Sequence, residues 1–428
     1  MTAFTITTTV GGKAFPITGF DITSGVFGSV GHMTSTSSIT MLTSLGIDLY
    51  SMAANATAPV EITVAITADQ GPAQLIFGGE YLDADWDYDR DSVSIHARDW
   101  AGQLVDQKRV LTNIAAGVEK LLAPLAPGKD PASLGTSNVN QTLAQIVTSI
   151  AGQFGMTPVL NLTGGLPGNT KIGTLYGTTD QTFLATPQSL WEILNQLARD
   201  TGYDVYVTPQ KQLVFGQAGA GLTPLNLTWK TNPVPNGAVP CRDLHIQHHP
   251  RRNATFRVVV FSYDPAKAQQ TTGYATVIGA NMAGSAGLKP GIWVGPDAVA
   301  ANAKLANVKE GGISSTQVPL YSFRSDGLTQ AQATARAQTI AIDIAKRELI
   351  LSCEIDGYPG ATPTQPVNIS GQVDPNFAGN GFYLNGFQHR FVMPKGDAQG
   401  GGLITRIKAL DIPTLGTGAT GNSDGPAI

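Results

Sequence analysis

Aspartates occupy every second position of the segment DADWDYDRD, which spans residues 83–91. Their spacing suggests a calcium loop, but Tyr88 stands where such a loop requires glycine and Ser94 where it requires a bidentate glutamate. On a β-strand, side chains alternate between two faces, with same-face carboxylates about 6.6 Å apart. Each such contact costs only about 0.6 kcal/mol in water but far more in a dry interior. We therefore predict no metal site but one solvated acidic face, formed by Asp83, Asp85, Asp87, Asp89 and Asp91.

A second segment, HIQHHPRR at residues 245–252, combines histidines with arginines. On a strand, His245 and His249 share a face while His248 points away, and no Cys or Glu stands in register to complete a zinc site. A basic surface that meets an acidic partner explains this composition better than a metal site. We predict that this partner-contact patch contains His248, Arg251 and Arg252.

Motifs for a catalytic nucleophile or a phosphate loop are absent from the sequence. There is no G-x-S-x-G segment, and the lysine of APGKD is followed by aspartate instead of Ser or Thr. Paired carboxylates are uninformative in a chain with 31 acidic residues. Cys241 and Cys353 match no metal spacing, so we expect two buried unpaired thiols, with a disulfide as the alternative. The chain is therefore predicted not to be an enzyme and to need no cofactor.

The composition of the 428 residues excludes further classes of function. A net charge of -4 argues against a broad basic surface for duplex nucleic acid. No apolar run approaches the 18 or so residues of a membrane span, and the N-terminus lacks the basic start and apolar core of a signal peptide. Charged residues make up only 14%, well below the usual quarter, which suits a protein whose surface is largely covered by neighbouring subunits.

The elements that carry these residues are mostly strands. Apolar residues alternate with polar ones around Val60–Ile66, and Gln74–Phe77 and Ser92–Ala97 follow as further strands, so we take 1–105 as a β-barrel or sandwich. Residues 106–240 form a mixed α+β middle domain. Leu143, Ile146, Val147 and Ile150 lie on one face of a helix that stops near Gly155.

A helix followed by a hairpin is predicted over residues 186–216. Thr186 can cap the helix, Pro187 suits its first position, and Gly202 can end it. The apolar residues of its buried face are Leu190, Trp191, Ile193, Leu194, Leu197 and Ala198. The chain then continues as a strand at 203–207, a turn, and a returning strand at 213–215.

Residues 241–412 return to strands and form the second predicted barrel domain. Within them, 263–318 is rich in Ala, Gly, Asn and Pro with sparse periodicity, so we expect a long loop or arm. A helix starts at Thr329, with Gln332 completing a capping box, and runs into a strand at Glu348–Ile355. Residues 413–428 are expected to be a flexible tail. The predicted fold is mainly β with α+β insertions.

Three segments resemble one family, the baseplate hub proteins of contractile tails, which includes phage late control D proteins and the N-terminal part of VgrG spikes of type VI secretion. Residues 189–216 are similar to the family's helix and hairpin. Residues 327–371 are similar to its helix, strand and Pro/Gly turn, and 381–391 with 401–410 to its closing pair of strands, where a histidine such as His389 often sits. The resemblance covers roughly 186–410 and is weaker over 1–105.

The resemblance implies an assembly function on the virion tail baseplate, built in the host cytoplasm. Each hub subunit carries two small tube-type β-barrel domains, so a homotrimer presents a pseudo-sixfold ring that joins the hexameric tail tube to a trimeric spike. The implied partners are a separate spike protein, a tail tube or tube-initiator protein, and baseplate wedge and tape-measure proteins. DNA would only pass through the lumen, which the acidic face at residues 83–91 would line if it does not face the outside.

Two other functions remain open at this stage. The chain could be the hub or tail-tip protein of a long flexible tail or a secretion spike. It could also be a tail enzyme that degrades the cell wall, with an active site hidden in 106–180 or 263–318, although neither region gathers a His with carboxylates or thiols.

Overall fold

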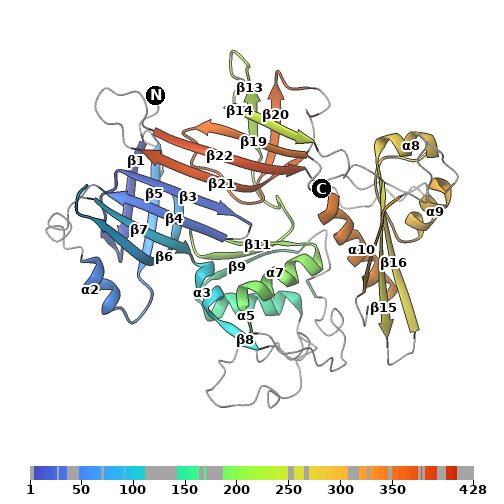
Figure 1. Cartoon of the computed structure of the whole chain (residues 1–428), viewed down its shortest axis with the longest axis horizontal. Helices are drawn as coiled ribbons and strands as arrows, with labels where there is room; N and C mark the ends of the chain where they lie inside the picture. Colours follow the sequence, from blue (N-terminus) through green and yellow to red (C-terminus); the bar gives the residue numbers. More distant parts are fainter. Residues whose placement is uncertain are drawn as a thin grey trace.

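The computed structural model describes residues 4–26, 28–35, 48–68, 72–90, 92–110, 142–162, 168–169, 187–248, 255–264, 269–306, 318–324, 328–345, 349–374, 377, 381–392 and 402–411. This part of the chain is mainly β, as predicted. Figure 1 shows an N-terminal sheet, a second β unit beside it, a mixed unit below them, and an α/β unit at one end. The predicted tail at 413–428 lies outside the described residues.

The N-terminal sheet has the strand order β2-β1-β5-β6-β7-β4-β3 and curves around one apolar core. Ile62, Val64 and Ile66 are fully buried in this core, so the predicted alternation is confirmed. A short helix, α2 (Leu49–Ala54), links β4 to β5. The strands are β1 (Phe4–Val10), β2 (Lys13–Ala14), β3 (Gly19–Gly25), β4 (Gly28–Ser35), β5 (Glu61–Ala68), β6 (Gln74–Asp87) and β7 (Ser92–Asp99).

The second β unit is a closed barrel with the pairing order β20-β13-β14-β19-β22-β21 and back to β20. Leu351, Cys353 and Ile355 point into its core, and Cys241 and Cys353 are both buried and free of a disulfide. A hydrogen bond with Cys241, together with burial, raises the pKa of the Cys353 thiol. The strands are β13 (Leu225–Trp229), β14 (Val239–His248), β19 (Leu349–Asp356), β20 (Pro366–Gly371), β21 (Phe382–Val392) and β22 (Gly402–Asp411).

The barrel contains one strand from the predicted middle domain, β13. Leu225–Trp229 pairs in parallel with β20 and with β14, so the predicted boundary at residue 240 is too late. The strand was missed because LNLTW has a short apolar alternation between a glycine-rich and a proline-rich segment. Its membership in the barrel depends on partners far away in the chain.

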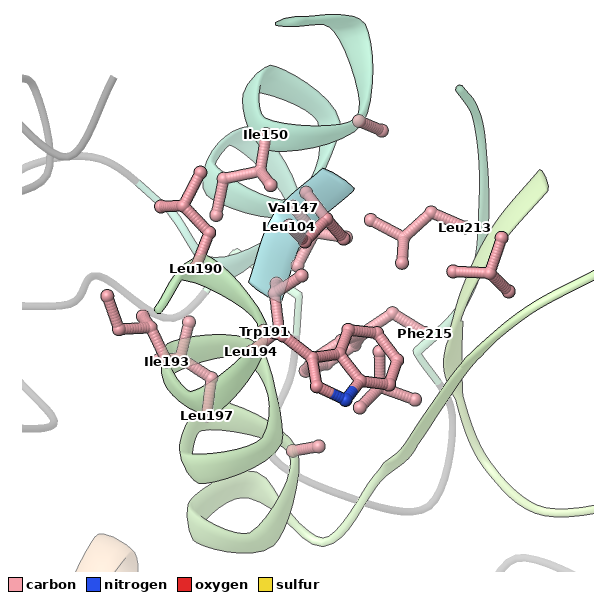
Figure 2. Close-up of a cluster of buried hydrophobic side chains, with 14 of the residues drawn as sticks. Leu104, Val147, Ile150, Leu190, Trp191, Ile193, Leu194, Leu197, Leu213 and Phe215 are labelled. Atoms are coloured by element: carbon pink, nitrogen blue, oxygen red, sulfur yellow. The ribbon is translucent and has the colours of Figure 1, made fainter. Parts of the chain in front are cut away.

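The middle unit packs two helices on a small sheet of order β11-β12-β9. Figure 2 shows Trp191 and Leu194 of α7 facing Phe215, with Val147 and Ile150 of α5 on the same cluster. The predicted apolar faces of both helices are buried, which confirms them. Its elements are α3 (Ala101–Asp106), β8 (Lys108–Val110), α5 (Leu143–Gln153), β9 (Thr157–Asn161), β10 (Pro187–Ser189), α7 (Leu190–Thr201), β11 (Asp204–Val207) and β12 (Gln212–Gly216).

The start of α7 differs from the prediction. The cap is Ser189, whose hydroxyl accepts from the Glu192 N–H at 3.1 Å while the Glu192 carboxylate accepts from the Ser189 N–H at 2.7 Å. Pro187 lies on β10, which pairs with β8, so it does not open the helix. A complete capping box outcompetes a lone Thr–Pro signal because it satisfies two backbone donors. Gly202 ends α7 with a φ of 82°, as predicted.

Residues 263–318 are not a simple loop or arm, which corrects that prediction for their described part. They belong to an α/β unit with the sheet order β17-β16-β15-β18, inserted between β14 and β19. The buried residues of its helices are mostly alanines, such as Ala298 and Ala301, and small side chains produce no strong apolar periodicity. Its elements are β15 (Phe256–Asp264), β16 (Gln269–Ile278), α8 (Ala280–Ala286), β17 (Gly291–Val294), α9 (Gly295–Leu305), β18 (Leu320–Arg324) and α10 (Gln330–Ala345).

Helix α10 crosses the sheet of this unit closely. Its buried ridge is Ala333, Ala337, Ala341 and Ala345, at a spacing of four residues, whereas Ile340 and Ile342 are only half-buried. Below the ridge lies Gly273 of β16, where a Cβ atom would sit 2.0 Å from the Ala333 carbonyl oxygen. Small residues on both elements therefore allow backbone-to-backbone contact. No helix in the described ranges is long and apolar enough to cross a membrane.

Candidate assembly interface

Three of the five aspartates lie on β6, which ends at Asp87. A turn follows at residues 88–90, where the Arg90 N–H donates to Asp87 Oδ1 at 3.0 Å. Asp89 therefore lies beyond the strand and Asp91 lies outside the described residues, so the prediction of one five-aspartate strand face is wrong at Asp89. The strand stops there because the chain must reverse into β7.

The acidic side of β6 is solvated, as expected. Asp83 and Asp85 are exposed, and the side chain of Asp85 is 83% accessible. Across the strand pair, His96 Nε2 of β7 lies 3.5 Å from Asp85 Oδ2. The opposite side of β6 packs on the core through Ala84 and Trp86. Two apolar side chains near this end of the strand are left exposed, Leu82 at 49% and Tyr88 at 79%.

The histidine segment begins on β14, where His245 and His248 are both exposed. The His248 ring meets Phe377 edge-on at a centroid distance of 6.5 Å. His249, Arg251 and Arg252 lie outside the described residues, so the predicted basic patch is placed only at His248. Within the ranges that the structure describes, no group of three His, Cys, Asp or Glu side chains could hold a metal ion.

A charged row that the sequence did not indicate crosses the outer side of the second barrel. Arg242, Glu354 and Arg406 are direct cross-strand partners on β14, β19 and β22. Glu354 accepts from Arg406 Nε at 2.5 Å and lies 3.3 Å from Arg242 Nε. The hydrogen bond from Arg406 holds the pKa of Glu354 below its ordinary value. The sequence does not show that these opposite charges are neighbours, because the three residues come together only through the strand register.

The two β units are joined by antiparallel pairing between β3 and the C-terminal half of β21. On the solvated side of this junction, Gln388 Nε2 donates to both carboxylate oxygens of Asp21 at 2.8 Å. Arg390 lies directly opposite Asp21 in the register. On the core side, Phe20 stacks on Phe391 at 5.7 Å. Both faces therefore hold the two units together as one continuous sheet.

His389 is buried beside this junction. The Thr405 hydroxyl donates to the Tyr358 carbonyl at 2.6 Å and lies 2.9 Å from His389 Nδ1. That hydroxyl can therefore accept from an Nδ1–H group, which defines the neutral tautomer. Burial lowers the pKa of His389 to about 3.

The two β units repeat the same topology. In chain order, β3 to β7 correspond to β14, β19, β20, β21 and β22. The spatial orders are β5-β6-β7-β4-β3 and β20-β21-β22-β19-β14, and every neighbouring pair is antiparallel in both. A bulge follows Tyr81 in β6 and Leu384 in β21. Only the first strands differ in direction, since β1 is antiparallel to β5 and β13 is parallel to β20.

An exposed apolar surface on the inserted unit was also missed from the sequence. β18 forms an edge of the sheet, and all its residues are exposed. Phe261 and Tyr263 on the neighbouring β15 are 40% and 42% accessible and line a hollow with Phe323. Clustered aromatic side chains of this kind are typical of contact surfaces.

Comparison with known proteins identifies the fold. No family model matches the sequence, and no curated protein matches it. Among solved structures, the tail protein from Neisseria meningitidis MC58 is similar with a TM-score of 0.57 and 13% identity, over 95% of this chain and 96% of that one. The 43 kDa tail protein of prophage MuSo2 from Shewanella oneidensis is similar with a TM-score of 0.52 and 14% identity, over 96% and 98%. The chain therefore has the fold of phage tail proteins.

Proposed function

We propose that this chain is the structural hub of a phage tail baseplate, in which three copies form a ring between the tail tube and a spike protein. The observation that carries the proposal is the repeated β unit. Two units in each of three copies make six similar units around one axis, which matches a sixfold tube on one side and a threefold spike on the other. The protein then acts as a symmetry adaptor in the virion tail and does no covalent chemistry.

The junction between β3 and β21 supports ring closure. It shows that these units can join edge to edge through backbone hydrogen bonds, without a separate linker element. A ring of six units needs the same kind of junction between chains. Closure would also cover strand edges that otherwise invite non-specific association.

The solvated side of the joined sheet supports a role as channel wall. On the face away from both cores, exposed side chains follow one another across strands of both units, including Asp85, Arg390, Arg406 and Arg242. Helix α3 covers this face only near Glu80 and Arg98, where Arg98 donates to Asp106, and the stretch around Asp83 and Asp85 is exposed. We assign it to the lumen, where Asp83 and Asp85 would repel the phosphates of passing DNA.

The native mass of the purified protein tests the hub function. We expect a trimer, alone or with its spike protein, by light scattering or native mass spectrometry, and a ring with six similar lobes in end-on electron micrographs. A chain that stays monomeric at all concentrations, including with the spike, would overturn the proposal. For the channel wall, Asp83→Lys with Asp85→Lys should reduce DNA delivery by virions that still assemble, whereas unchanged delivery would place this face outside the lumen.

A further inference from the structure

In the joined sheet, β6 and β14 each have a long segment with a neighbour on only one side among the described residues. β6 pairs with β5 as far as Glu80 and with β7 as far as Asp87. β14 pairs with β13 as far as Cys241 and with β19 as far as His248. The second half of β6 and most of β14 therefore present backbone donors and acceptors without a described strand to receive them. Such edges are templates for pairing with another chain.

The chain already contains the pairing that these edges lack. β21 occupies the position of β6 in the repeat, and its second half, beyond the bulge, pairs with β3. β3 occupies the position of β14. The intrachain junction therefore joins a β6-type edge to a β14-type edge, and the two edges left over are β6 and β14 themselves.

The register of this missing junction follows from printed partners. After the bulge, pairing resumes at Asp83 in β6 and at Gly386 in β21. Asp87 and Arg390 each lie four residues further on, so Asp87 corresponds to Arg390. His245 corresponds to Asp21 through the ladders to β19 and β22 in one unit and to β4 and β7 in the other. The pair Arg390 and Asp21 in the chain thus corresponds to Asp87 and His245 between chains.

We propose that the second half of β6 pairs antiparallel with β14 of the next copy, with Asp87 opposite His245, Trp86 opposite Ile246 and Asp85 opposite Gln247. This inference rests on the proposed ring of three copies and names the surfaces that close it. The acidic strand and the histidine strand, which lie in different β units of one chain, meet each other at every boundary between chains.

The side chains agree with this register on both faces. Trp86, Ile246 and Leu244 are half-buried on the core side of their strands. Tyr88, which is 79% exposed, falls opposite Leu244, so pairing extends the apolar layer across the boundary. On the solvated face, a His245 N–H can donate to Asp85 on the diagonal, in the place where Gln388 donates to Asp21 within the chain.

The charges also distinguish the two junctions. Within the chain the acid lies on the β14-type strand, at Asp21, and the donor Gln388 and the cation Arg390 lie on the β6-type strand. Between chains the acids lie on β6 and the histidine on β14. A wrong pairing of β6 with β3 of another copy would place Asp87 opposite Asp21, and like charges directly opposite are unfavourable. The opposite placement of the acids in the two junctions therefore favours pairing of β6 with β14 over pairing of β6 with β3. Asp243 at the β14 bulge adds one acid to the histidine strand.

Cross-linking with paired cysteines tests the proposal on the full chain. Cross-strand partners lie within the distance that a disulfide spans. Asp87→Cys with His245→Cys should give covalent dimers and trimers on oxidation. Each single variant, which retains the buried Cys241 and Cys353, should give none. The out-of-register pair Asp83→Cys with His245→Cys should also give none, because its positions lie about 13 Å apart along the strand.

An intrachain pair provides the matched control. Arg390→Cys with Asp21→Cys should form a disulfide without changing the mass of the denatured chain. Suppose that the protein is a native trimer in which the control disulfide forms and the disulfide between positions 87 and 245 does not. This result would overturn the edge assignment but would not contradict the hub function. A protein that never trimerises would overturn the hub function itself.

Charge exchange gives an independent result if the cysteine variants assemble poorly. His245→Asp should raise the dissociation constant of the trimer by about tenfold or more, because a like-charge pair arises at every boundary. Adding Asp87→Arg should restore most of the loss. Failure of the second change to restore the trimer, with unchanged melting of the monomer, would contradict the proposed register.

Discussion

At the scale of single residues, the polar groups with the best-defined roles are structural. Gln388 and Asp21 join the two β units, and Glu354 links Arg242 to Arg406 across the second barrel. His389 completes a buried hydrogen-bond chain. These groups stabilise the joined sheet, whereas Asp83, Asp85 and His245 are exposed on its surface.

The buried His389 predicts a pH dependence of stability. Its pKa is about 3 in the folded protein and near its ordinary value of 6.5 in the unfolded chain. Between these values the unfolded chain binds more protons, so the stabilisation is complete above about pH 6.5 and is lost as the pH falls toward 3. His389→Asn should reduce the fall in unfolding free energy between pH 6.5 and pH 4, measured by urea denaturation at each pH. An unchanged slope would assign the acid sensitivity to other groups.

At the scale of elements, small residues decide how closely the helices of the inserted unit approach the sheet. Gly273→Ala would place a Cβ 2.0 Å from the Ala333 carbonyl oxygen, so β16 and α10 would have to separate. We expect a loss of about 1–3 kcal/mol, the usual cost of overpacking. Calorimetry, together with the rate of proteolysis within residues 255–345, would measure it.

A second glycine is the matched control. Gly152 lies on the exposed side of α5, where an added Cβ would meet nothing within 4 Å. Gly152→Ala should therefore stabilise the protein by about 0.5–1 kcal/mol, because alanine has the higher helix propensity. If both variants had the same effect, the close approach at Gly273 would not be what limits that position.

At the scale of the whole molecule, the inserted α/β unit is separable from the β units. Its two ends are adjacent, because His248 and Leu349 are direct partners in the pairing of β14 with β19. Replacing residues 249–348 by Asn-Gly should convert the two strands into a hairpin and leave the second barrel folded, since this dipeptide favours the turn that fits such a connection.

Circular dichroism and native mass would test this excision. We expect retained β structure and an unchanged oligomeric state, because both proposed edges lie outside the removed segment. Some stability should be lost with the contact between α10 and the middle unit, where Ala335 packs on the core around α7. A shortened chain that is unfolded would show that the inserted unit is required for the barrel to form.

Local patterns by themselves determined much of this protein. Alternation at Val60–Ile66 and at Leu349–Ile355 identified core strands, and the stripes of α5 and α7 identified buried helix faces. These predictions were correct because large apolar side chains recur with the period of their element. The inserted unit was missed because alanine and glycine pack closely without producing such a signal.

Only the tertiary structure decided which strands are neighbours. Strand order, the repeat of β3–β7 in β14–β22, and the pairing of Gln388 with Asp21 depend on contacts between residues hundreds of positions apart. The sequence showed an acidic strand and a histidine strand as separate features. Their relation as the two complementary edges of the repeat appears only when register is known, because a strand's pattern specifies which face it buries and not which edge it pairs with.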